Sequence, residues 1–201
     1  MIKCDVNICA LITRNAAVKE KDGQEFFVFG VKLPVEGLDG KKAYLDISVS
    51  NNGGKGMAAS YTTNRRVAVK GPMTVRKKNG KVYYNLRSEG DAEITKPSAV
   101  DNIEGEMEFI GKIGKNGVVD KVDKNGKPFK TFSAFSSDKN GDSTEFSWVN
   151  FMYFEPKDVE SFLAAGKYVH VKGTLQLGVY EEKVSLQCVV KEIEEYVFPE
   201  K

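Results

Sequence analysis

Two nine-residue segments of this chain are close copies of one another. Residues 67–75 read VAVKGPMTV and residues 169–177 read VHVKGTLQL, at an offset of 102 positions. Further positions match at the same offset: Tyr44 with Phe146, Ile47 with Val149, Lys81 with Lys183 and Val82 with Val184. A repeat close to half of the 201-residue length indicates two duplicated domains rather than a solenoid of short units.

The repeat also indicates where one domain gives way to the next. Residues 95–105 read TKPSAVDNIEG, a polar segment that contains Pro97. Such composition is typical of a connection between domains. We therefore predict a first domain over residues 1–97 and a second over residues 104–198.

Each half reads as a series of short β-strands. Apolar and β-branched residues alternate with period two or form short runs, which is typical of strands. In the first half the predicted strands include 26–33, 43–50, 66–75 and 82–87. In the second half they cover 106–114, 129–136, 145–154, 168–177 and 183–194. Asn79-Gly80 predicts a type I′ hairpin between the last two strands of the first half.

One helix is predicted, over residues 156–165 (PKDVESFLAA), with Pro156 in its first turn and Gly166 as its stop. The equivalent stretch of the first half, residues 51–64, is Gly-rich and is expected to be a loop or a short irregular helix. Five strands with this connection between the third and fourth is the order of an OB-fold. We predict an all-β chain of two tandem five-stranded OB-fold barrels, with one short helix in the second. A pair of SH3-like barrels is the alternative, but it leaves no natural place for that helix.

The second half resembles the bacterial single-stranded DNA-binding protein family, SSB. The matching segments are FIGKIGK (109–115), FKTFSAFSSD (129–138), SWVNFMYF (147–154), VESFLAAGKYVHVKGTLQL (159–177) and VSLQCVVKEIE (184–194). The family shows the same order: a glycine-marked first strand, a third strand with a tryptophan, and a helix that leads into V-x-V-x-G-x-L. The first half shares the resemblance only through the internal repeat.

The resemblance implies binding to single-stranded DNA and particles of four OB-folds, which a two-barrel chain would reach as a homodimer. Apolar strand surface beyond the needs of one barrel core supports the same expectation. The chain departs from the family in its short, mildly acidic end, residues 192–201, where the family has a disordered tail with an acidic tip. Tyr180 matches a family aromatic only loosely, and Asp46 stands at the first-half counterpart of Trp148.

The predicted strand 145–154 presents an aromatic face. If Val149, Phe151 and Tyr153 face the core, the alternate residues face outward. Exposed aromatic rings suit the stacking of unpaired bases, each worth roughly 1–3 kcal/mol. The candidate nucleic-acid contacts of the second half are Lys112, Phe135, Phe146, Trp148, Asn150 and Tyr180. Trp148 occupies the place where the family has a stacking aromatic; a core or interface position is the alternative, since large aromatic residues are usually well buried.

The first half is basic. Residues 1–100 hold 17 basic and 10 acidic residues, whereas residues 101–201 hold 13 and 18. Halves of opposite sign indicate different roles, or attraction between them. Lys and Arg side chains along a bound nucleic-acid strand neutralise its phosphates, and this releases counterions. The candidates are Arg65, Arg66, Arg76, Lys77, Lys78, Lys81 and Arg87, with Tyr83 interleaved; a merely solvated surface is the alternative.

The sequence does not indicate an enzyme. His170 is the sole histidine and no catalytic constellation can be named around it. The glycine motifs of nucleotide-binding loops are missing from the sequence. Cys4, Cys9 and Cys188 are odd in number and lack a CxxC pair, so we expect no disulfide, metal or cofactor. The first residues do not resemble a signal peptide and no long apolar run exists, so we expect a cytoplasmic protein without a membrane partner.

We predict a binder of single-stranded nucleic acid, with single-stranded DNA favoured and with little base specificity. Its expected roles are replication, recombination, or the DNA metabolism of a phage or mobile element, with proteins of replication or recombination as further partners. RNA stays open, because no motif announces contacts to the 2′-hydroxyl. The alternatives are a tandem-OB adaptor, whose outward aromatic residues bind a protein, and an oligosaccharide binder.

Overall fold

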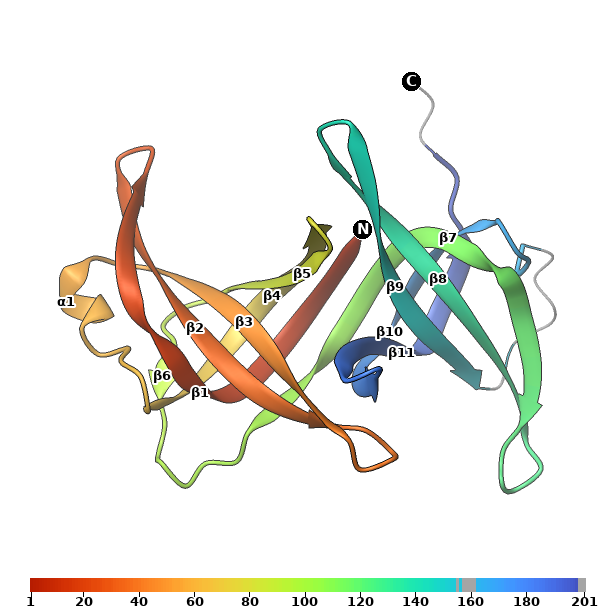
Figure 1. The fold of residues 1–201 in the computed structure, drawn as a ribbon, viewed down its shortest axis with the longest axis horizontal. Coiled ribbons are helices and arrows are strands. Elements are labelled where there is room, and N and C mark those ends of the chain that lie inside the picture. Colours follow the sequence, from red (N-terminus) through yellow and green to blue (C-terminus); the bar gives the residue numbers. More distant parts are fainter. Residues whose placement is uncertain (155, 157–161, 199–201) are drawn as a thin grey trace.

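The computed structural model describes residues 1–154, 156 and 162–198, and these form two β-barrels side by side (Figure 1). The elements of the first barrel are β1 (Ile2–Lys21), β2 (Gln24–Glu36), β3 (Lys42–Asn52), α1 (Lys55–Ala58), β4 (Arg66–Lys78), β5 (Lys81–Arg87) and β6 (Glu93–Ile94). Those of the second are β7 (Asn102–Val122), β8 (Pro128–Asn140), β9 (Ser143–Phe154), β10 (Tyr168–Tyr180) and β11 (Lys183–Glu195). Every strand expected from the sequence is present.

The first barrel closes in the order β1-β2-β3-β5-β4-β1. All neighbours in this ring are antiparallel except β3 and β5, which are parallel. Alternation along each strand sends one set of side chains into the barrel, where Phe27, Phe29 and Tyr61 form an aromatic core with ring centroids 4.9–6.2 Å apart. The second barrel repeats this order as β7-β8-β9-β11-β10-β7, again with one parallel pair, β9 with β11. Each ring is therefore an OB-fold barrel, as the sequence predicted.

The two barrels are joined by pairing between β1 and β7. The register runs from Ile2 opposite Phe109 to Cys9 opposite Asn102. Ile8 of β1 pairs with Val69, and Phe109 of β7 pairs with Val171. Val69 and Val171 are equivalent in the repeat, so Ile8 and Phe109 are equivalent too. The pairing of these two equivalent strands is therefore symmetric, and its centre is the pair Asp5 and Glu106. This pairing makes one continuous sheet, β4-β1-β7-β10, across both barrels.

The glycine of the repeated V-x-V-K-G segment allows two strands to approach closely. A Cβ atom at Gly173 would collide with the backbone carbonyl oxygen of Val189, and one at Gly71 with that of Arg87. In β10 this approach coincides with a register shift against β11 between Lys172 and Gly173. The glycine is thus required by backbone packing at the same point of both barrels.

Of the helix predicted for residues 156–165, residues 157–161 lie outside the described residues, and the described residues are not helical. Its described end, residues 162–165, forms a turn in which the N–H of Ala164 donates to the carbonyl of Phe162 at 2.8 Å. The short helix that the structure describes, α1, lies in the first barrel, within the Gly-rich segment 51–64. Among the described residues, no helix has the length and apolar character needed to cross a bilayer.

The cysteines are free thiols, with Cys4 and Cys188 buried and Cys9 partly so. Burial raises the pKa of both Cys4 and Cys188 to about 12. Both therefore behave as small apolar core residues.

Candidate nucleic-acid interface

The outer face of β8 and β9 carries a cluster of aromatic rings. Val149, Phe151 and Tyr153 are buried in the barrel, so the predicted phase of β9 is confirmed. The alternate residues point outward, and Trp148 and Phe146 are 52% and 44% exposed. Phe135 lies opposite Trp148 in the register, and its ring centroid is 5.0 Å from those of both Trp148 and Phe146. Trp148 is therefore a surface residue of the barrel.

The rings of Phe146 and Trp148 line a groove that reaches the first barrel. We call it the second groove, because most of its residues belong to the second barrel. It is lined by Lys77, Phe146, Trp148, Asn150, Tyr180 and Lys183, among others. Lys77 comes from the basic hairpin between β4 and β5, whereas the remaining residues come from β9, β10 and β11. A cation of the first barrel and the aromatic rings of the second thus share one surface.

Three polar side chains that line the second groove are hydrogen-bonded to one another. The hydroxyl of Ser133 donates to the side-chain oxygen of Asn150 at 2.7 Å, and the amide of Asn150 donates to the Ser185 hydroxyl at 3.2 Å. These bonds fix the amide of Asn150 beside Trp148, which restricts how a ligand could use it. Tyr180, at the end of β10, is 68% exposed and borders the groove.

Carboxylates of the second barrel bind the basic hairpin of the first. Asn79 and Gly80 both have positive φ, as the predicted type I′ turn requires. Their N–H groups donate to the two oxygens of Glu145 at 2.6 Å each, and the N–H of Lys77 donates to Asp138 at 2.9 Å. The hairpin is therefore fixed against the second barrel by its backbone.

This contact explains part of the opposite charge of the two halves. The donors are backbone groups, so the side chains of Arg76 and Lys78 stay exposed at the hairpin. Glu145 and Asp138 nevertheless lie beside them and reduce the positive potential there. We therefore expect the hairpin to attract phosphates less strongly than its three cations alone would.

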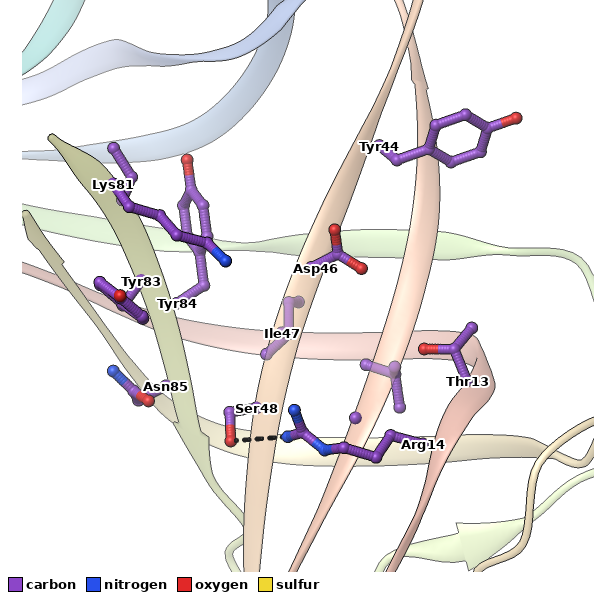
Figure 2. A pocket seen from close by; sticks show the side chains of 13 residues that line it. Thr13, Arg14, Tyr44, Asp46, Ile47, Ser48, Lys81, Tyr83, Tyr84 and Asn85 are labelled. Atoms are coloured by element: carbon purple, nitrogen blue, oxygen red, sulfur yellow. Dashed lines mark hydrogen bonds between the residues drawn. The ribbon is translucent and has the colours of Figure 1, made fainter.

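The first barrel contains an equivalent groove (Figure 2). This first groove is lined by Arg14, Tyr44, Asp46, Ser48, Lys81 and Tyr83, among others. Seven of its positions on β3 and β5 correspond at the repeat offset of 102 to residues of the second groove: Tyr44 to Phe146, Asp46 to Trp148, Ser48 to Asn150, Lys81 to Lys183, Val82 to Val184, Tyr83 to Ser185 and Tyr84 to Leu186. The duplication has therefore produced two grooves at the same place on two barrels.

The two grooves adjoin along β5. Val82 and Tyr84 line both of them. Tyr84 packs against the core, and burial raises its pKa to about 12, so its hydroxyl stays protonated. The first and second grooves are therefore neighbours, separated by β5.

Several predicted cations lie outside both grooves. Arg66 is half-buried and its guanidinium contacts Asp101, and Arg65 donates to the Ser60 carbonyl at 2.8 Å. Arg87 is exposed at the end of β5. Lys112 lies over the ring of Tyr168, with its ammonium 5.8 Å from the ring centroid. Of the predicted residues, the two grooves bring together Lys77, Lys81, Tyr83, Phe146, Trp148, Asn150 and Tyr180. Phe135 packs against the rings of Phe146 and Trp148.

The sequence reasoning missed Tyr44 and Arg14. Tyr44 is 59% exposed, and the ammonium of Lys32 lies 5.5 Å from its ring centroid. Its match with Phe146 in the repeat was a usable signal. Arg14 donates to the Ser48 hydroxyl at 3.4 Å. It lies where the register of β1 against β2 shifts, and no sequence pattern indicated that irregularity.

His170 lies on the outer side of β10, between two carboxylates. Its Nδ1 is 2.7 Å from Glu194 and its Nε2 is 2.8 Å from Glu108. The sole histidine thus belongs to a polar network on the strand surface and lies away from both grooves.

The chain is similar to several solved single-stranded DNA-binding proteins. No protein-family profile matches the sequence, and no curated protein matches it. The structure is similar to the single-stranded DNA-binding protein of Thermus aquaticus, with 12% identity, 98% of this chain and 95% of that chain covered, and a TM-score of 0.49. The small single-stranded DNA-binding protein of Streptomyces coelicolor matches 47% of this chain and 93% of its own, at 17% identity and a TM-score of 0.38. The Plasmodium falciparum single-stranded DNA-binding protein in complex with single-stranded DNA matches 44% of this chain and 90% of its own, at 16% identity and a TM-score of 0.35. The OB-fold assignment itself rests on the strand order and register described above.

Proposed function

We propose that this protein binds single-stranded nucleic acid, with single-stranded DNA as its ligand, and that it is not an enzyme. The observation that carries the proposal is the pair of adjoining grooves. Exposed aromatic side chains and lysines line both of them, and this is the combination that sequence-tolerant binding requires. The similarity of fold to single-stranded DNA-binding proteins agrees with it.

The proposal extends to biological context and domain organisation. The roles that fit such binding are replication, recombination and the DNA metabolism of a phage or mobile element, in the cytoplasm. The two barrels act as domains over residues 1–97 and 104–198. The rival function is that of a protein adaptor, and the exposed cluster of Phe135, Phe146 and Trp148 is the feature that would serve it.

Salt dependence is the first test. We expect binding to an oligo-dT strand to weaken steeply as salt rises, because bound phosphates release counterions. Replacing Arg76, Lys77 and Lys78 with Ala should lower the slope of log affinity against log salt by up to roughly 0.7 per lost contact. The variant should remain folded, since the bonds to Asp138 and Glu145 come from the backbone. Fluorescence anisotropy of a labelled strand at several salt concentrations measures both quantities.

A matched control removes three exposed lysines outside both grooves: Lys41, Lys55 and Lys96. This control should lose less of the salt slope than the hairpin variant does. Equal slopes for the hairpin variant and the wild type would show that the basic hairpin carries only solvated charge. Tight binding that stays flat from low to high salt would contradict the electrostatic basis of the proposal.

We also propose that the chain forms a homodimer with four barrels. Where β1 and β7 pair, the exposed residues are polar, including Lys3, Asp5 and Glu106. An interface over this face would therefore be polar, unlike the apolar surface that the sequence led us to expect. Sedimentation at micromolar concentration should give twice the chain mass of 22.3 kDa. A single-chain mass would contradict the homodimer and leave the binding proposal intact.

A further inference from the structure

The two grooves differ most at one pair of equivalent positions. The second groove has Trp148, a member of its aromatic cluster, where the first groove has Asp46 at the same position of the repeat. Both residues point outward from the third strand of their barrel, at registers opposite Phe135 and Lys32 respectively. The first groove thus exchanges a stacking surface for a carboxylate.

The carboxylate of Asp46 is available to a ligand. Its side chain is 71% exposed, and its contact with the Lys32 ammonium is long, at 3.6 Å. In Figure 2 it points into the groove between Tyr84 and Tyr44. The ammonium of Lys32 also faces the ring of Tyr44, so it is shared between two partners.

A carboxylate here has to face bases rather than phosphates. Phosphates would be repelled by Asp46, and the cations that could hold them, Arg14 and Lys81, lie at other positions along the groove. Tyr44 and Tyr83 are 59% and 43% exposed, so both offer a ring face for an unpaired base. The groove therefore combines stacking surfaces, flanking cations and one acceptor between them.

An ionised carboxylate only accepts hydrogen bonds. Guanine presents two adjacent donors, N1–H and the 2-amino group, that match both carboxylate oxygens. Cytosine and adenine each present one amino group beside a ring-nitrogen acceptor. Thymine presents a single N3–H between two carbonyl oxygens, which repel a carboxylate.

We propose that the first groove is a base-selective subsite in which Asp46 accepts hydrogen bonds from the Watson–Crick edge of guanine and disfavours thymine. This inference rests on the proposed function, since it needs a single strand in the groove. It adds a modest base preference to binding that stacking and phosphate contacts otherwise make sequence-tolerant.

Three labelled strands of equal length test it: oligo-dT, oligo-dT with isolated guanines, and the same strand with inosine at each guanine. Inosine keeps N1–H and lacks the 2-amino group. We expect the full chain to bind the guanine strand roughly 3- to 10-fold more tightly than oligo-dT, about the effect of one net hydrogen bond, with inosine between them. Asp46→Asn should reduce this ratio towards one, because its side chain has only one acceptor oxygen.

Asp91→Asn is the matched control, since it removes the same charge from an exposed residue outside both grooves. It should keep the guanine preference even if overall affinity rises. Equal binding of the three strands by the wild type, or a preference that survives Asp46→Asn, would overturn the base-selective subsite while the proposed function stands. Failure to bind any of the strands would instead refute the proposed function.

Discussion

Trp148→Ala is expected to weaken binding to oligo-dT by roughly 5- to 150-fold, which corresponds to the loss of one stacked base. The slope of log affinity against log salt should stay nearly unchanged, because no cation is removed. The variant should fold as the wild type does, since the indole is 52% exposed and lies outside the barrel core. The hairpin variant described above should behave in the opposite way, with a smaller slope.

A matched aromatic control lies on the same strand. Phe154 is 44% exposed on β9 and lies outside both grooves, so Phe154→Ala should bind nearly as the wild type does. Trp148 is the only tryptophan, so quenching of its fluorescence by oligo-dT reports directly on stacking in the wild type, and anisotropy of a labelled strand serves for the variants. If Trp148→Ala folds and binds as before, stacking at this position is refuted and the adaptor function gains.

Gly173→Ala is expected to lower the free energy of unfolding by about 1–3 kcal/mol or more, because backbone overpacking cannot be relieved by a rotamer change. The added methyl group would collide with the carbonyl oxygen of Val189 and also crowd the sulfur of Cys188. Denaturant unfolding followed by circular dichroism gives this free energy. The same substitution at Gly71 should act alike, because it would meet the Arg87 carbonyl.

Gly56→Ala is the control for this comparison. Gly56 lies in α1 and a Cβ atom there would meet nothing within 4 Å. Alanine also favours a helix by roughly 0.5–1 kcal/mol over glycine, so this variant should be as stable as the wild type or more so. Equal stabilities of Gly173→Ala and Gly56→Ala would refute the close approach between β10 and β11 as the reason for the repeated glycine.

The local features of each barrel could be predicted from the sequence. Alternation along 145–154 assigned Val149, Phe151 and Tyr153 to the core and Trp148 to the surface, because side chains of a strand point to opposite faces. Asn79-Gly80 predicted its turn because few other residues adopt positive φ at both positions. The predicted contacts with nucleic acid at these places await the binding experiments.

The relation between the barrels was decided by tertiary structure. Pairing of β1 with β7, and the hydrogen bonds from the N–H groups of Asn79 and Gly80 to Glu145, join residues 65 to 107 positions apart. Backbone donors are common to every sequence, so no residue pattern indicated which carboxylate would bind them.

The first groove shows the same division within a single barrel. The repeat determined that Tyr44 and Asp46 correspond to Phe146 and Trp148 and that they share a strand face. Only the parallel pairing of β3 with β5, and the register shift of β1 at Arg14, placed them in one groove with Lys81 and Arg14. Sequence alone determined what each strand presents, because strand periodicity is local; the fold decided which faces meet, because that depends on contacts between distant parts of the chain.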